Sequence, residues 1–139
     1  MFVWKNEYSC NIAEIDAQHK RLFELAGDLY AIATAKEDVD YYDDICRILQ
    51  ELSDYTVYHF GYEEQLMDYH GYSPAESRAH KWEHAAFIAK LQKIQESDLD
   101  LNQRKVLMDI IIFSVDWIEK HILETDKKYI AFFNTKGIS

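Results

Sequence analysis

The sequence predicts an all-α protein, an up-down-up-down antiparallel four-helix bundle with an N-terminal arm. Four long stretches repeat their apolar residues with the 3.6-residue period of an α-helix. The chain has only four glycines and one proline, so it offers few places to turn. The segments between the four stretches are short, which favours antiparallel neighbours. A chain of 139 residues is expected to form one domain, with the arm at residues 1–15 and the bundle at residues 16–133.

The first two helices are predicted from their apolar faces and from the polar residues around them. The first is expected to begin with Asp16 as its N-cap and to run to about Ala35. Asp38 and Asp40 stand before the second helix, which is expected to run to about Tyr69. Both segments place apolar side chains three and four residues apart, so each presents one face to a core.

The third helix has the clearest start in the sequence. Ser73 is a suitable N-cap, Pro74 fits the first helical position, and Glu76 completes a capping box. This helix is expected to end near residues 96–102, and the fourth is expected at about residues 103–133.

The residues before the first helix are too apolar for a free tail. They include Phe2, Val3, Trp4, Ile12 and Ile15. We therefore expect an ordered arm that lies along the bundle.

Composition excludes several classes of protein. The hydrophobic fraction of 48% and the net charge of −10 describe an acidic globule, which argues against nucleic acid or an anionic membrane as a partner. No signal peptide is visible, and Asp109 and Asp116 interrupt the most apolar segment before it reaches membrane-spanning length. Cys10 and Cys46 do not have the spacing of metal ligands, and we expect both to be reduced thiols. We expect a cytoplasmic monomer.

Seven polar side chains interrupt the apolar faces at one level of the predicted bundle. His59 and Glu63 show the pattern, because residues four apart share one face of a helix. In an antiparallel bundle the starts of helices one and three lie beside the ends of helices two and four. Five of the six histidines and two carboxylates therefore converge, and His70 alone is expected in an exposed turn. The converging residues are His19, His59, Glu63, His80, His84, His121 and Asp126.

Their chemistry indicates a metal site. Taken singly, each residue could be a hydrogen-bonded core side chain or a solvated surface group. Taken together, imidazoles and carboxylates without thiolates suit iron, manganese, zinc or copper. Seven side chains are too many for one zinc ion, which four ligands usually satisfy. Two metals that share both carboxylates would explain how Glu63 is tolerated in an apolar face.

The same residues resemble a known family. His19, "HFGYE" from His59, "HKWEH" from His80 and "HILETD" from His121 are similar to the ligand motifs of the hemerythrins, in particular the bacterial hemerythrin-like proteins. The resemblance covers essentially the whole chain. It implies a non-haem di-iron centre that binds O2.

The resemblance also implies which residues bind which iron. One iron would be held by His80, His84 and His121, the other by His19 and His59, and Glu63 and Asp126 would bridge them together with an oxo or hydroxo group. One coordination position then stays open on the iron with two histidines.

O2 is expected to bind at that position in a dry pocket, although the pocket residues could equally be ordinary core. The expected pocket residues are Trp4, Leu22, Phe60, Phe87, Trp117 and Ile118. Ile118 departs from the leucine that is common at this position in the family, which affects the shape of the pocket.

Reversible O2 binding, for storage, delivery or sensing, is therefore the expected function. The alternative is a di-iron enzyme, such as an oxidase, peroxidase or nitric oxide reductase. It is less favoured because such sites are usually rich in carboxylates, whereas this one is rich in histidine. A signalling module is a third class, for which no output domain is visible.

One spacing predicts an irregular helix. His121 and Asp126 are five residues apart, so on an ideal α-helix they would point about 140° apart. We expect either a locally widened turn, such as a π-bulge, or an Asp126 side chain that reaches back across the helix.

Overall fold

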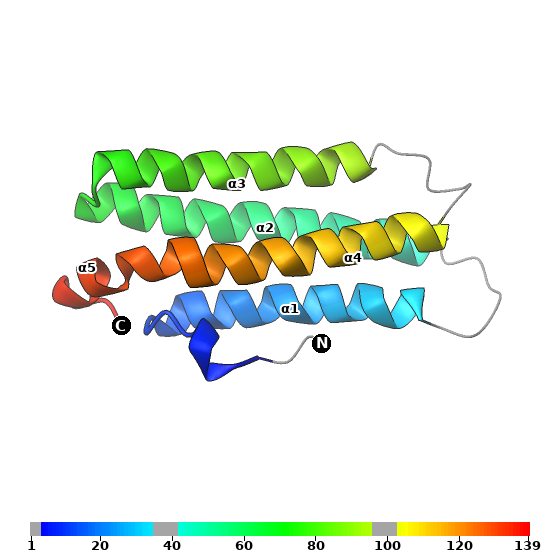
Figure 1. Ribbon diagram of the computed structural model, residues 1–139, viewed down its shortest axis with the longest axis horizontal. Coiled ribbons are helices and arrows are strands. Elements are labelled where there is room, and N and C mark those ends of the chain that lie inside the picture. The colour runs from blue at the N-terminus through cyan, green and yellow to red at the C-terminus, as the bar shows by residue number, and fades with distance from the viewer. Residues whose placement is uncertain (1–3, 35–41, 96–102) are drawn as a thin grey trace.

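A computed structural model describes residues 4–34, 42–95 and 103–139 of the chain. All the regular elements within these residues are helical (Figure 1). The α-helices are α1 (Ala13–Ala33), α2 (Tyr42–His70), α3 (Pro74–Gln95), α4 (Gln103–Lys120) and α5 (Ile130–Thr135). The short elements are the 3₁₀-helix η1 (Asn6–Tyr8), the π-helix η2 (His121–Thr125) and the 3₁₀-helix η3 (Asp126–Tyr129).

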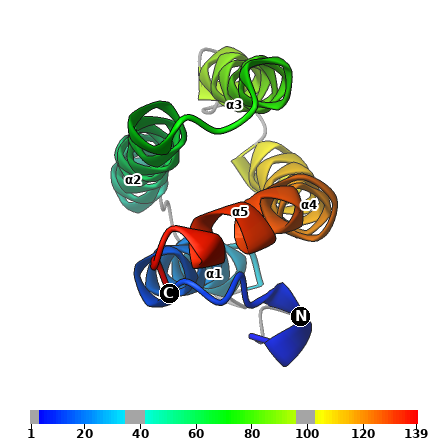
Figure 2. The same cartoon turned by 90° about the vertical axis from the view of Figure 1, so that its left-hand side faces the viewer.

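The four long helices form the antiparallel bundle that the sequence predicts. α1 packs against α2 and α4, and α3 packs against the same two helices. The end view shows the four axes around a common centre, with α5 crossing the end of the bundle (Figure 2). The predicted ends of the first and third helices, and the predicted start of the second, lie outside the described residues.

The described part of the N-terminal arm, from Trp4 onward, packs on the bundle, whereas Phe2 and Val3 lie outside the described residues. Tyr8, Cys10, Ile12 and Ile15 are buried together with the apolar faces of the long helices. Each such apolar side chain removed from water stabilises the fold by roughly 1.5–3 kcal/mol. Burial therefore explains why the arm lies along the bundle, as expected from its composition.

The first helix begins earlier than predicted. Its N-cap is Ile12, not Asp16, because the backbone N–H of Asp16 already donates to the Ile12 carbonyl at 2.9 Å. Asp16 lies in the first turn and binds the arm instead. Its carboxylate accepts hydrogen bonds from the Ser9 hydroxyl at 2.6 Å and the Cys10 backbone N–H at 2.8 Å. The third helix begins at Pro74 as predicted.

The fourth helix is not continuous to Phe133. α4 ends at Lys120, and the chain then passes through the π-helix η2 and the 3₁₀-helix η3. The widened turn predicted from the spacing of His121 and Asp126 is therefore confirmed. The short α5 follows, and its Phe133 packs with Tyr129 at the end of the bundle, with ring centroids 4.9 Å apart.

Candidate metal centre

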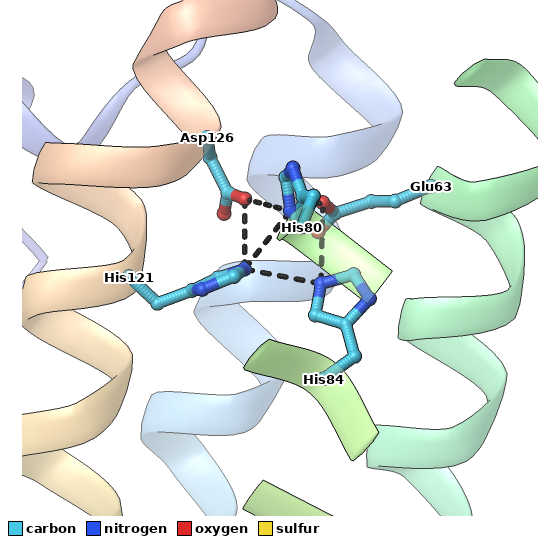
Figure 3. Close-up of side chains that lie close together, drawn as sticks. All are labelled: Glu63, His80, His84, His121 and Asp126. Atoms are coloured by element: carbon cyan, nitrogen blue, oxygen red, sulfur yellow. Dashed lines mark hydrogen bonds and ion pairs between the residues drawn. The ribbon is translucent and has the colours of Figure 1, made fainter. Parts of the chain in front are cut away.

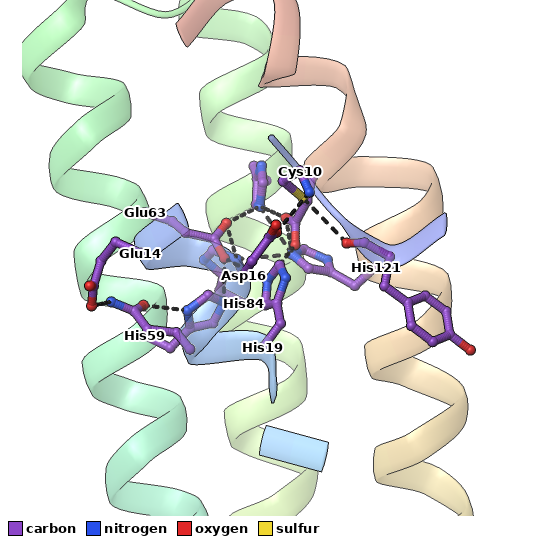
Figure 4. Close-up of polar contacts among 12 residues, drawn as sticks. Cys10, Glu14, Asp16, His19, His59, Glu63, His84 and His121 are labelled. Carbon is purple, nitrogen blue, oxygen red and sulfur yellow. Dashed lines mark hydrogen bonds and ion pairs between the residues drawn. The ribbon is translucent and has the colours of Figure 1, made fainter. Parts of the chain in front are cut away.

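The structure brings all seven predicted side chains together inside the bundle. α1 contributes one histidine, α2 one histidine and the glutamate, α3 two histidines, η2 one histidine and η3 the aspartate. Each of the seven is at most 5% exposed: His19, His59, Glu63, His80, His84, His121 and Asp126. Figures 3 and 4 show that they point toward one another from different helices.

The seven residues form two overlapping groups of potential ligand atoms. Within each group, these atoms all lie within 4.8 Å of one another. One group is His80, His84 and His121 with Glu63 and Asp126, and the other is His19 and His59 with the same two carboxylates. The two carboxylates are therefore shared between a three-histidine half and a two-histidine half.

The three-histidine half places its ring nitrogens in contact with one another. Nε2 of His121 lies 3.0 Å from Nε2 of His80 and 3.0 Å from Nε2 of His84 (Figure 3). Oδ1 of Asp126 lies 3.0 Å from Nε2 of His121 and 2.9 Å from Nε2 of His80. Three imidazole nitrogens and a carboxylate oxygen therefore surround one point.

The two-histidine half faces the other carboxylate oxygens. Nε2 of His19 lies 3.2 Å from Oδ2 of Asp126 and 3.6 Å from Oε1 of Glu63. Nε2 of His59 also contacts Oε1 of Glu63, which is fully buried. Glu63 reaches the other half through Oε2, which lies 3.2 Å from Nε2 of His80.

Three of the five histidine rings have, near Nδ1, a polar side chain from outside the set of seven. We call these side chains outer partners, because they lie behind the rings. Gln18 Oε1 is hydrogen-bonded to His59 Nδ1 at 2.7 Å. Glu64 Oε1 lies 3.5 Å from His84 Nδ1 and Glu83 Oε2 lies 3.4 Å from His121 Nδ1, which are ion-pair distances without hydrogen-bond geometry. A carbonyl or carboxylate oxygen can only accept, so each contact favours a ring with its proton on Nδ1 and a lone pair on Nε2.

Sequence reasoning missed these outer partners. Each stands next to a predicted ligand along the chain, yet serves a histidine on another helix. Gln18 precedes His19, for example, but contacts His59 of α2. Adjacency to a ligand motif was the available signal, but only the rotation of the packed helices shows which ring each partner reaches.

The electrostatics of the site favour positive charge at its centre. Burial lowers the pKa of His80, but its close contacts with the carboxylates of Asp126 and Glu63 outweigh burial and raise the pKa to about 9. Burial also acts against His121, whose pKa the Asp126 charge raises to about 10. Burial and the Glu63 charge would raise the pKa of Asp126, but His121 and His19 outweigh them and lower it. Both carboxylates are therefore ionised in the interior.

The donor set fits a pair of metal ions. Within the described residues, all four carboxylate oxygens of Glu63 and Asp126 are buried without a hydrogen-bond donor. Inward lone pairs of imidazoles 3.0 Å apart repel one another unless a cation or proton lies between them. Dications would satisfy these atoms as protons do, and imidazole with carboxylate is the ligand chemistry of iron, manganese, zinc and copper.

Two aromatic residues of the predicted oxygen pocket stack on rings of the three-histidine half, although the pocket is expected over the other half. Phe60 stacks on His84 with ring centroids 3.8 Å apart, and Trp117 stacks on His121 at 4.3 Å. Phe60 also lies 5.8 Å from the ring of His59 in the two-histidine half. Phe87 packs against Trp117 at 4.4 Å. The other two core members, Leu22 and Ile118, are buried.

The remaining pocket residue, Trp4, lies in the arm. Among the described residues, its ring contacts are with Tyr8 at 5.7 Å and Phe23 at 6.2 Å, and the Lys20 ammonium lies over it. These contacts do not test its place in the oxygen pocket, which stays a prediction.

Tyr129 is a neighbour of the site that the sequence pattern did not indicate. Its ring lies parallel to that of His80, with centroids 5.7 Å apart, and its hydroxyl is buried. It follows Asp126 by less than one helical turn, so η3 positions both. The sixth histidine, His70, is half-buried beside Phe133, not fully exposed.

Two cavities open beside the three-histidine half. One of about 360 Å³ has His80 in its wall, and the other of about 200 Å³ has His121 in its wall. Glu83 and Thr125 border both cavities. The neighbourhood of His80 and His121 is therefore the side of the site that lies near solvent.

Comparison with known proteins identifies the family and agrees with the fold. A model of the family described as "Hemerythrin HHE cation binding domain" matches residues 10–133. The chain is 39% identical over 130 residues to the bacteriohemerythrin of Clostridium acetobutylicum, which covers 94% of this chain and 99% of that protein. It is 33% identical to the bacteriohemerythrin of Pseudomonas aeruginosa, over 92% of this chain and 78% of that protein.

A solved structure shows the same likeness in three dimensions. A crystal structure of wild-type hemerythrin superposes with a TM-score of 0.76 at 29% identity, over 91% of this chain and 93% of that chain. The chain belongs to the hemerythrin family, as the sequence motifs predict. In the described part of the chain, none of the helices combines the length and apolar character needed to cross a membrane.

Proposed function

We propose that this protein binds O2 reversibly at a non-haem di-iron centre. The observation that carries the proposal is the division of seven buried side chains into two groups that share both carboxylates. The family to which the chain belongs binds non-haem iron and O2.

In this proposal the two halves have different tasks. His80, His84 and His121 would hold one iron, and His19 and His59 the other, with Glu63 and Asp126 bridging. Bound iron would supply the electrons that hold and release O2. The half with only two histidines has one ligand fewer, so that half leaves room for O2.

The protein itself keeps solvent out of the site and supplies negative charge beside the metals. The seven side chains are almost completely removed from solvent, which limits side reactions with water. The two buried carboxylates compensate the charge of the metals. Outer partners hold the rings, so the site needs little rearrangement when the ligand enters or leaves.

The enzyme alternative is less well supported by the same geometry. The cavities beside the site have His80 and His121 in their walls, and both belong to the half with three histidines. A substrate in either cavity would therefore approach the half that has no vacant position in the proposal. O2 is small enough to reach the other half through fluctuations of the packed core.

Repeated oxygenation tests the proposal. The protein is loaded with iron, analysed for metal, reduced under nitrogen, exposed to air and then stripped of gas. Two irons per chain and a visible charge-transfer band that appears and vanishes over many cycles are expected. The zinc-loaded protein, which has no accessible redox state, is the control and shows no band. Steady O2 consumption with added reductant and a released product would favour the enzyme instead.

A further inference from the structure

His19 differs from its neighbours in its outer contact. His84 and His121 each have a carboxylate near Nδ1, and His59 has the amide oxygen of Gln18. His19 is 1% exposed. Its Nδ1, like that of His84 and of His121, has no hydrogen-bond partner within the described residues, but unlike those two atoms it has no ion pair with a carboxylate either. Its Nε2 faces Glu63 and Asp126, so Nδ1 is the atom left for an outer partner.

Two polar groups lie near the His19 ring, the Cys10 thiol and the Asp16 carboxylate, and both oxygens of the carboxylate already accept hydrogen bonds from the arm. Cys10 is completely buried, and its Sγ, a ring nitrogen of His19 and a carboxylate oxygen of Asp16 all lie within 4.8 Å of one another (Figure 4). The arm segment is fixed there by two hydrogen bonds to Asp16, from the Cys10 backbone N–H and the Ser9 hydroxyl. The sulfur is therefore held beside His19 by the fold.

We propose that Cys10 is the outer partner of His19, its sulfur accepting the Nδ1–H, and that the arm thereby positions the first ligand of the centre. Cys10 is a positioning residue in this role and does not bind the metal. The inference rests on the proposed metal centre, because it concerns the orientation of one of its ligands.

The assignment makes the two halves of the site chemically different. Carboxylates behind two of the three rings increase the basicity of those imidazoles, which favours the higher oxidation state of a bound metal. An amide and a thiol behind the other two rings are neutral, so His59 and His19 remain weaker donors. The half that is proposed to take up O2 is then the half that returns more readily to the ferrous state.

The first test measures metal retention and does not depend on O2. Zinc-loaded wild type, Cys10→Val, Cys10→Ser and Cys46→Val are mixed with excess chelator, and the release of zinc is followed. Cys46 is the other thiol, on α2 and roughly 20 Å along that helix from His59.

Loss of an outer partner typically weakens metal binding 10–100-fold, so Cys10→Val is expected to release zinc at least tenfold faster. Cys10→Ser, which keeps an acceptor, and Cys46→Val are expected within about threefold of wild type. Wild-type release from Cys10→Val would overturn the proposal.

The second test reads the ring directly and needs only the folded wild type and Cys10→Ser. Nitrogen NMR of the zinc-loaded protein with labelled histidine should show His19 protonated on Nδ1, with a signal that shifts in Cys10→Ser. A His19 protonated on Nε2, or a signal unchanged in Cys10→Ser, would overturn the proposal even if Cys10→Val failed to fold. A sulfur-to-metal charge-transfer band in the cobalt-loaded protein would make Cys10 a ligand and would also overturn it. If the protein failed to bind O2 reversibly but Cys10→Val still released zinc fast, the proposed function would be refuted and the role of Cys10 would stand.

Discussion

Asp126 is the residue on which both halves of the centre depend. Its Oδ1 contacts the rings of His80 and His121, and its Oδ2 contacts His19. It is fully buried and its charge is compensated by these imidazoles or by metal. Removing one partner of a buried ionic set leaves the others without compensation.

Substitution Asp126→Ala is therefore expected to reduce iron content below two per chain and to lower the free energy of unfolding by about 3–5 kcal/mol. Metal analysis and denaturant unfolding measure the two effects. Asp116→Ala is the matched control, because Asp116 is exposed on α4. Full iron occupancy with unchanged stability in Asp126→Ala would contradict the bridging role.

At the scale of the elements, two local irregularities build the site. The π-helix η2 widens the turn after His121, so that Asp126 points to the same interior as the histidine five residues before it. The arm is the second irregularity, because Asp16 in the first turn of α1 holds Ser9 and Cys10 over His19. The first irregularity brings Asp126 to the site and the second brings Cys10 to it, and a regular helix in either place would not do so.

The role of Asp16 in holding the arm can be tested by Asp16→Ala. Asp16 is half-buried, so each of its two hydrogen bonds is expected to contribute the ordinary net value of about 0.5–1.5 kcal/mol. The variant is expected to lose roughly 1–3 kcal/mol of stability, with faster hydrogen exchange at the Cys10 amide. Asp28→Ala, an exposed site on the same helix, should change neither. Unaltered exchange at Cys10 would show that burial alone holds the arm.

For the whole molecule, the charge at its centre links folding to metal and to pH. In the metal-free protein the carboxylates raise the pKa of His80 to about 9 and that of His121 to about 10, above the ordinary 6.5. A raised histidine pKa stabilises the folded state fully below pH 6.5, and this stabilisation is lost as pH rises through the folded values. His84, whose pKa burial lowers, has the opposite effect below pH 6.5.

The free energy of unfolding of the metal-free protein should therefore fall between pH 7 and pH 9.5. In the iron-loaded protein, metal takes the place of the protons, so the fall should be much smaller and the stability higher throughout. Denaturant unfolding at pH 7.0, 8.0, 9.0 and 9.5, with and without iron, makes the comparison. A metal-free protein whose stability does not fall over this range would show that His80 and His121 are neutral in the folded state.

The sequence alone determined the four helices, their antiparallel order and the seven converging side chains, because each depends on periodicity along one helix. The spacing of His121 and Asp126 predicted either a widened turn or a side chain that reaches back across the helix, and the structure has the widened turn. Which outer group serves which ring was decided only by the tertiary structure, as Gln18 on α1 and His59 on α2 show. The true start of α1 and the contacts of Trp4 were likewise settled by packing. A sequence specifies which face of a helix is apolar, but the rotation and offset between two packed helices depend on all the side chains between them.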